Sequence, residues 1–112
     1  MINKLLVFTE NKETRIVRTY ADTYTDDEIK EIILLEKDSN IIGDIIFKKF
    51  DDIYFCLVVK NENELYALGL INTLVETLNY KFPNLTDINF VYQFKEIYDI
   101  IDSMFVGGYV IQ

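Results

Sequence analysis

The distribution of apolar residues in the first half of the chain predicts four strands. Residues 5–8 are a continuous apolar run, and residues 15–20 follow a short polar segment, so the two runs are expected to form a hairpin. Two further strands are expected at residues 45–50 and 53–59, where β-branched and aromatic residues dominate. Asp51-Asp52 supplies the turn between them. Because residues 53–59 are apolar throughout, we expect a central strand covered on both faces.

Helical patterns separate and follow these strands. Thr25, with Glu28 three residues later, is a capping-box pattern that opens a helix fading by residues 38–40. A longer helix begins near Asn63 and ends at Pro83. Thr86 begins a third helix, whose apolar stripe is wider than one face needs, and Gly107-Gly108 is expected to end it. The apolar positions of these last two helices are Leu65, Leu68, Ile71, Leu74, Val75, Leu78 and Phe82, then Ile88, Val91, Phe94, Ile97, Tyr98, Ile101, Met104 and Phe105.

The predicted order of elements is ββαββαα, which indicates an α+β fold (an α/β sandwich). In it, an antiparallel sheet of four to five strands is flanked by helices. The 112 residues fit one domain spanning 1–112. Half of the residues are apolar and 14% are aromatic, so the chain can supply a core. A domain this small buries a limited fraction of its surface, and the surplus of apolar residues favours an interface.

Charge and cysteine content narrow the classes of function. The formal net charge of −8 disfavours nucleic-acid binding and direct binding to an anionic membrane. A single cysteine, Cys56, indicates a reducing compartment. The first eight residues are too short an apolar run for a signal or spanning segment, so we expect a cytoplasmic protein.

The residues needed for common catalytic and metal sites are missing from the sequence. There is no histidine, which removes the commonest general base and metal ligand. Cys56 lies in an apolar run and is expected to be a core residue rather than a nucleophile. The carboxylates lie in runs typical of solvated surfaces. We therefore expect no enzyme, no catalytic residue, no metal site and no cofactor.

Several segments, in order along the chain, resemble the small (sigma) chain of the clathrin-adaptor family. Residues 45–56, IIFKKFDDIYFC, are similar to that family's I-I-Y-R-R-Y-A-G-L-Y-F-C. Residues 64–78 resemble its N-E-L…F-V-E-V-L helix, and residues 84–90, NLTDINF, stand where it has N-V-C-E-L-D-L. Residues 94–108 resemble F-Y-K-V-Y…D-E-M-F-L-A-G, and KETR at residues 12–15 resembles G-K-T-R on the first hairpin.

This resemblance implies a longin-like fold, with residues 1–112 as a single adaptor small-chain domain. It also implies a vesicle-coat adaptor complex in which the small chain is held against a large subunit. The medium subunit and a cargo-tail peptide are further implied partners. The membrane would be reached only through the complex, as a peripheral association with vesicle or endomembrane coats.

The resemblance further implies a site that binds acidic dileucine sorting signals. The matching positions for its apolar pocket are Val75, Asn84, Leu85, Ile88 and Phe90, and the matching cationic position is Arg15. An arginine can bind a carboxylate through two charge-assisted hydrogen bonds. Asp51-Asp52 stands where the family has a small Ala-Gly-type pair close to this site, and its carboxylates would repel an acidic signal.

Two other functions remain open at the level of sequence. The same fold could serve as a stand-alone, medium-chain-type or coatomer-small-chain-type trafficking domain, acting as a homodimer or as a regulator of GTPases. A small enzyme or ligand-binding domain would instead require a deep pocket with convergent polar groups.

Overall fold

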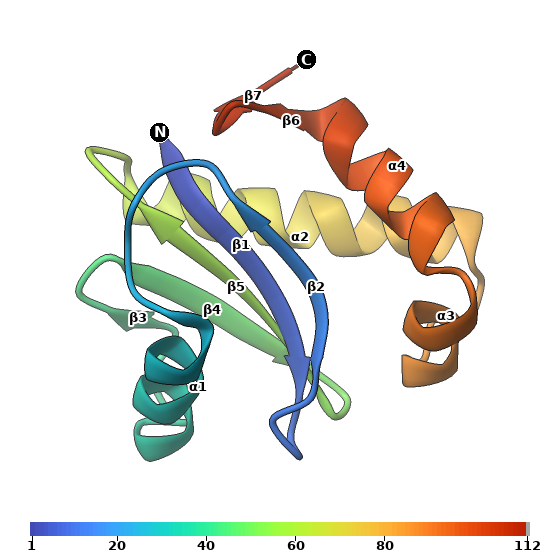
Figure 1. Ribbon diagram of the computed structural model, residues 1–112, viewed down its shortest axis with the longest axis horizontal. Helices are drawn as coiled ribbons and strands as arrows, with labels where there is room; N and C mark the ends of the chain where they lie inside the picture. Colours follow the sequence, from blue (N-terminus) through green and yellow to red (C-terminus); the bar gives the residue numbers. More distant parts are fainter. Residues whose placement is uncertain (112) are drawn as a thin grey trace.

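A five-stranded antiparallel sheet forms the centre of the protein, and the computed structural model describes residues 1–111 of it (Figure 1). The strand order is β2-β1-β5-β4-β3, which confirms the predicted antiparallel sheet and the α+β class. The bounds of the strands are β1 (Ile2–Thr9), β2 (Thr14–Thr19), β3 (Ile41–Ile42), β4 (Ile45–Phe50) and β5 (Ile53–Val59). The predicted sequence of strands missed β3, whose two residues are too few to show a period.

Helices cover both faces of this sheet. Helix α2 (Glu64–Lys81) crosses behind it in Figure 1, and α1 (Asp26–Leu35) lies on the near face. Strand β5 pairs with β1 on one side and β4 on the other, and all seven of its residues are buried. Its odd-numbered residues belong to the core under α2, and its even-numbered residues belong to the core under α1. The expectation of a central strand covered on both faces is confirmed.

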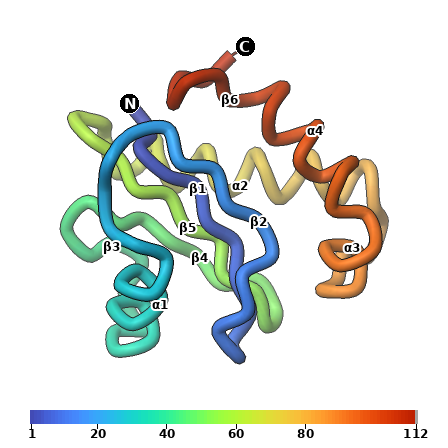
Figure 2. Tube along the Cα trace, in the orientation of Figure 1, coloured from blue at the N-terminus to red at the C-terminus, as the bar shows by residue number. Residues whose placement is uncertain are grey.

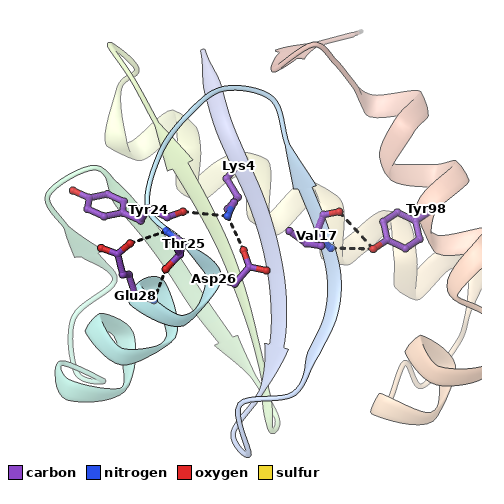
Figure 3. Close-up of polar contacts among 7 residues, drawn as sticks. All are labelled: Lys4, Val17, Tyr24, Thr25, Asp26, Glu28 and Tyr98. Atoms are coloured by element: carbon purple, nitrogen blue, oxygen red, sulfur yellow. Dashed lines mark hydrogen bonds and ion pairs between the residues drawn. The ribbon is translucent and has the colours of Figure 1, made fainter.

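A capping box and a buried lysine hold the start of α1. Thr25 Oγ1 accepts from the Glu28 amide, and the Glu28 carboxylate accepts from the Thr25 amide, which confirms the capping box. Lys4 of β1 is almost fully buried, and its Nζ donates to Tyr24 O at 3.1 Å and Asp26 Oδ1 at 2.6 Å (Figure 3). The first turn of α1 is thus held both by its own cap and by a cation from the sheet.

The region predicted as one third helix is two helices. Helix α3 (Asp87–Tyr92) and helix α4 (Phe94–Met104) meet at Gln93, whose ψ of 30° departs from helical geometry. Both helices lie beside the edge strand β2 (Figure 1). The Val17 amide of β2 donates to the Tyr98 hydroxyl of α4 at 3.1 Å (Figure 3). The side chain therefore satisfies a donor that an edge strand would otherwise leave open.

The prediction that Gly107-Gly108 ends a helix is wrong. Helix α4 has already ended at Met104, and the two glycines form the turn between strands β6 (Phe105–Val106) and β7 (Tyr109–Val110). Both glycines have positive φ, as such a turn requires. The Ile2 amide donates to Gly108 O at 2.8 Å, so the last strands close against the first one, and Figure 2 shows the two ends of the chain on the same side.

Candidate functional site

A small pocket of about 140 Å³, with both apolar and polar lining residues, lies at the end of the sheet where β4 turns into β5. We call it the α2–β5 pocket. It is lined by Phe50, Asp51, Ile53, Phe55, Val75, Asn79 and Leu85. The hairpin of β4 and β5 supplies the first four, α2 supplies the next two, and the loop after α2 supplies Leu85.

Backbone conformation places the two loops that border this pocket. Asp51 adopts a positive φ of 56° in the tight turn between β4 and β5, a conformation that Asp tolerates better than most residues. After Pro83, Asn84 also takes a positive φ of 62°, and it redirects the chain from α2 toward α3. The Thr86 amide then donates to Asn89 Oδ1 at 2.9 Å at the start of α3. These turns bring Leu85 of one loop and Asp51 of the other to the same pocket.

Aromatic rings make the wall between this pocket and α3. Phe55 lies edge-on to Phe50, with ring centroids 5.6 Å apart, and also edge-on to Phe90, with centroids 5.9 Å apart. Phe90 is buried on α3 and does not line the α2–β5 pocket. It supports the pocket from behind, through Phe55, and fixes α3 to the core.

Arg15 is held by carboxylates of the same chain. Its Nε contacts Asp87 Oδ1 at 2.7 Å, and its Nη2 contacts Asp87 Oδ2 at 2.9 Å, which is the two-bond geometry of a strong arginine–carboxylate pair. Glu13 Oε2 lies 3.1 Å from the same Nη2. The hydrogen bond to Asp87 raises the pKa of Arg15 above its ordinary value. The side chain is only 20% exposed, so little of the guanidinium faces solvent.

The structure brings together only part of the residue set expected from the sequence. Val75 and Leu85 line the α2–β5 pocket, and Arg15 is tied to Asp87, two residues after Leu85. Asn84 and Ile88 are exposed and do not line this pocket. Phe50, Ile53 and Phe55 were not expected at the site, because the sequence of a buried hairpin shows only that its residues are apolar. Asn79 of α2 was not expected there either.

Exposed apolar residues form a second feature, on α3 and the first residue of α4. We call it the α3 surface: Ile88, Val91, Tyr92 and Phe94, of which Ile88 is 65% and Tyr92 80% exposed. Three of these residues, Ile88, Val91 and Phe94, belong to the predicted stripe that is wider than one face needs. They face outward because the break at Gln93 turns α3 away from the line of α4.

A wider apolar groove of about 560 Å³ lies between α2 and the last two strands. We call it the C-terminal groove, and it is lined by Tyr66, Gly69, Leu70, Thr73, Thr77, Met104, Val110 and Ile111. Leu65, one of the apolar positions of the predicted helix, is 76% exposed, next to Tyr66 of this groove. The second residue of the helix is therefore exposed to solvent.

Metal-ligating side chains and the single cysteine were candidates for chemistry in residues 1–111. No group of three or more His, Cys, Asp or Glu residues in this part of the chain could hold a metal ion. Cys56 is buried in β5, and desolvation raises the pKa of its thiol far above the ordinary value. A thiol in this state is a poor nucleophile. The helices that the structure describes are all too short or too polar to cross a membrane.

Comparison with known proteins agrees with this architecture over the full chain. The family model described as clathrin adaptor complex small chain matches residues 1–112. The human AP-1 complex subunit sigma-3 is 28% identical over 122 aligned residues, which cover 96% of this chain and 79% of that protein. The AP-2 complex subunit sigma of Gibberella zeae is also 28% identical, over 96% of this chain and 85% of its own length.

A structural match supports the same fold. One chain of a homology model of the full-length AP-3 complex in a stretched open conformation superposes with a TM-score of 0.70. The two chains are 24% identical, and the match covers 100% of this chain and 85% of the other. This family consists of non-enzymatic subunits, in agreement with the expectation from the sequence. The chain belongs to the family of clathrin adaptor complex small (sigma) chains.

Proposed function

We propose that this small chain packs against a large subunit of a vesicle-coat adaptor complex and there supports vesicle-mediated transport of proteins. The observation that carries the proposal is the α3 surface, where four large apolar side chains within seven consecutive residues are exposed. Apolar residues grouped in this way favour a protein interface over contact with water. The proposal covers adaptor complexes of the AP-1, AP-2 and AP-3 types alike, because relatives from all three align with the chain.

Co-expression with candidate large subunits tests this packing. We expect a stable heteromer. The double substitution Ile88→Asp with Tyr92→Ser should weaken it by more than about tenfold, because the first change places a charge against the partner and the second removes aromatic contact area. Leu35→Asp is the matched control, since Leu35 is equally exposed but lies at the end of α1 on the other side of the sheet. Loss of the heteromer with the control as well would contradict the assignment of the interface to α3.

A homodimer is the competing outcome for the same surface. If light scattering shows that the purified chain is a stable homodimer and the chain binds none of the large subunits, the stand-alone trafficking role replaces the adaptor role. A chain that stays monomeric and captures a large subunit supports the proposal. Within such a complex the chain would be cytoplasmic and would reach vesicle or endomembrane coats only through its partners, with the medium subunit as a further neighbour.

We also propose that the α2–β5 pocket receives an apolar side chain of a cargo-tail peptide of the dileucine type. Val75 and Leu85, two of the positions expected for such a site, line it together. Fluorescence anisotropy should show that a peptide with two adjacent leucines binds more tightly than the same peptide with two serines. Leu85→Ser should weaken this binding by about tenfold, since it removes buried apolar contact, whereas Ile88→Ser, outside the pocket, should not. Equal binding of both peptides would end the cargo assignment.

A further inference from the structure

A polar pocket of about 460 Å³ lies at the end of the sheet where β1 begins and β5 ends, next to the start of α1. We call it the Asn3 pocket. Ile53 of the α2–β5 pocket and Lys60 of this one are separated by the length of β5, so the two pockets lie about 20 Å apart. The Asn3 pocket is lined by Asn3, Asp22, Thr23, Tyr24, Glu28, Asp44 and Lys60.

Carboxylates dominate the charge of the Asn3 pocket. Asp22, Glu28 and Asp44 outnumber the one cation, Lys60, so the lining carries two net negative charges. Hydrogen bonds from Thr25 lower the pKa of Glu28, which keeps that carboxyl ionised at neutral pH. Asp22 and Asp44 form no ion pair within residues 1–111. Their carboxylates are therefore available to a cation from outside the chain.

The charged groups next to the pocket do not cancel this charge. Lys4 Nζ donates to Tyr24 O, but it is paired with Asp26 at 2.6 Å (Figure 3). The N-terminal ammonium of Met1, beside the start of β1, is paired with Glu62. Each of these pairs is neutral as a whole, so the pocket stays negative.

Asn3 supplies an acceptor that the fold leaves unused. The pairing of β1 with β5 has one extra residue on β1 between Ile2 and Lys4, and Asn3 is that residue. Its Oδ1 is buried and has no hydrogen-bond partner within residues 1–111. A buried acceptor without a partner is unfavourable. Rotation of the amide about χ2 turns this oxygen toward a donor that enters the pocket, and binding of the donor would remove the unfavourable state.

Tyr24 adds an aromatic surface to these acceptors. Its side chain lines the pocket together with Glu28, and Figure 3 shows the ring directed away from Lys4. A guanidinium stacks on aromatic rings and donates to carboxylates through a planar pair of N–H groups, whereas an ammonium has no planar face. A metal ion is a poor occupant, because no group of acidic side chains in residues 1–111 could hold one.

We propose that the Asn3 pocket binds an arginine side chain of a protein partner. Asp22 and Asp44 accept hydrogen bonds from the guanidinium, and Tyr24 stacks on its plane. The net negative charge, the unused acceptor and the aromatic ring are together complementary to this one side chain. This role is independent of the α3 surface and of the α2–β5 pocket, because neither shares a residue with the Asn3 pocket.

Three short peptides, Ac-Gly-X-Gly-NH2 with arginine, lysine or the neutral analogue citrulline at X, test this binding. Their affinities for the full chain are measured by NMR titration of backbone amides at low and physiological ionic strength. Coulomb's law for one charge about 5 Å from two net opposite charges in water gives a roughly fifteenfold preference for arginine over citrulline. Physiological salt should reduce this preference to roughly fivefold. Stacking on Tyr24 should favour arginine over lysine by about threefold.

Three variants assign the binding to the pocket. Asp22→Asn with Asp44→Asn removes both net charges, so the preference for arginine over citrulline should fall to about one. Lys60→Gln acts in the opposite direction and should tighten arginine binding roughly fourfold at low ionic strength. Tyr24→Leu should remove the preference for arginine over lysine.

The matched control for the first variant is Glu36→Gln with Asp38→Asn. These two exposed residues lie at the far end of α1, outside the pocket, and their substitution changes the net charge by the same amount. At physiological ionic strength this control should keep the preference for arginine.

Each possible result bears on the role of the pocket. A preference for arginine that disappears in Asp22→Asn with Asp44→Asn, persists in the control and grows in Lys60→Gln supports the proposal. Equal binding of the arginine and citrulline peptides, an equal loss in the control, or amide shifts that map outside the Asn3 pocket would overturn it. Equal binding of lysine and arginine would overturn the assignment to arginine. None of these results changes the adaptor or cargo roles, which use other surfaces.

Discussion

The substitution Gly108→Ala tests how the last two strands are attached to the sheet. A Cβ atom built on Gly108 would lie 2.3 Å from the carbonyl oxygen of Ile2 and 3.2 Å from Cβ of Tyr20. Neither neighbour is the flexible end of a side chain, so the turn itself must move. Gly108 also has a φ of 89°, a conformation that L-residues rarely adopt.

Three losses set the expected magnitude. The backbone conformation costs about 1 kcal/mol with an L-residue. Displacing the turn breaks the Ile2–Gly108 hydrogen bond, which is worth about 1 kcal/mol. Partial exposure of Phe105, which is buried at the base of the turn, costs about 1 kcal/mol more. We expect Gly108→Ala to lower the free energy of unfolding by about 3 kcal/mol.

Gly107→Ala is the matched control for this substitution. Gly107 has a φ of 59°, but nothing lies within 4 Å of an added Cβ, so only the backbone term of about 1 kcal/mol remains. With a urea slope of about 1.5 kcal/mol/M, the unfolding midpoints should fall by about 2 M for Gly108→Ala and about 0.7 M for Gly107→Ala. Hydrogen exchange of the Ile2 amide should accelerate only in Gly108→Ala. Equal midpoints for the two variants would refute the reasoning, because the collision with Ile2 would then carry no energy.

Two further predictions concern the contacts of α4 with β2. Tyr98→Phe removes the hydroxyl that accepts from the Val17 amide, and should cost about 1–2 kcal/mol and speed exchange of that amide; Tyr80→Phe, at an exposed tyrosine, should change neither. The hydrogen bond from Arg18 holds the pKa of Asp102 below its usual value, so this pair stabilises the fold above the ordinary pKa of Asp, about 3.9, and the stability is lost as pH falls through the lower folded pKa. Since Asp102 is 48% exposed, the contribution is under about 1 kcal/mol. Asp102→Asn should flatten the acid limb of a plot of unfolding free energy against pH, and an unchanged limb would contradict it.

The elements predicted well were those whose signal is local. The capping box at Thr25 and Glu28 fixes the start of α1 through its own two hydrogen bonds, so sequence spacing suffices. The β4–β5 hairpin likewise follows from two strong runs separated by Asp51-Asp52. The break at Gln93 carries no such signal, because neither glycine nor proline marks it.

Glycine pairs show why local signals can also mislead. Gly107-Gly108 allows positive φ, which suits the end of a helix and the turn of a hairpin equally. The pairing of β6 with β7 and the hydrogen bond to Ile2, more than a hundred residues away in sequence, show that the turn is the one formed in this chain. Local sequence patterns also do not show that Val75 and Leu85 share a pocket, because this depends on how α2 and the following loop meet β5. The two residues were named together only through the resemblance to the family.

The use of cations inside the fold bears on what partners this chain can bind. Six of the eleven lysines and arginines are engaged by groups of the same chain, and they are Lys4, Arg15, Arg18, Lys30, Lys48 and Lys49. All six join a strand or helix to a segment distant in sequence. Lys4, Arg15, Arg18 and Lys49 are paired with carboxylates, so these pairs leave the net charge of −8 unchanged and make these four cations less available to an acidic partner. A partner whose contact face is apolar with a basic rim would therefore associate with this chain faster than one with an acidic rim, and the difference should shrink as salt rises. The same reasoning applies to Arg15, the cation that the resemblance matches to an acidic signal, because it is already paired with Asp87.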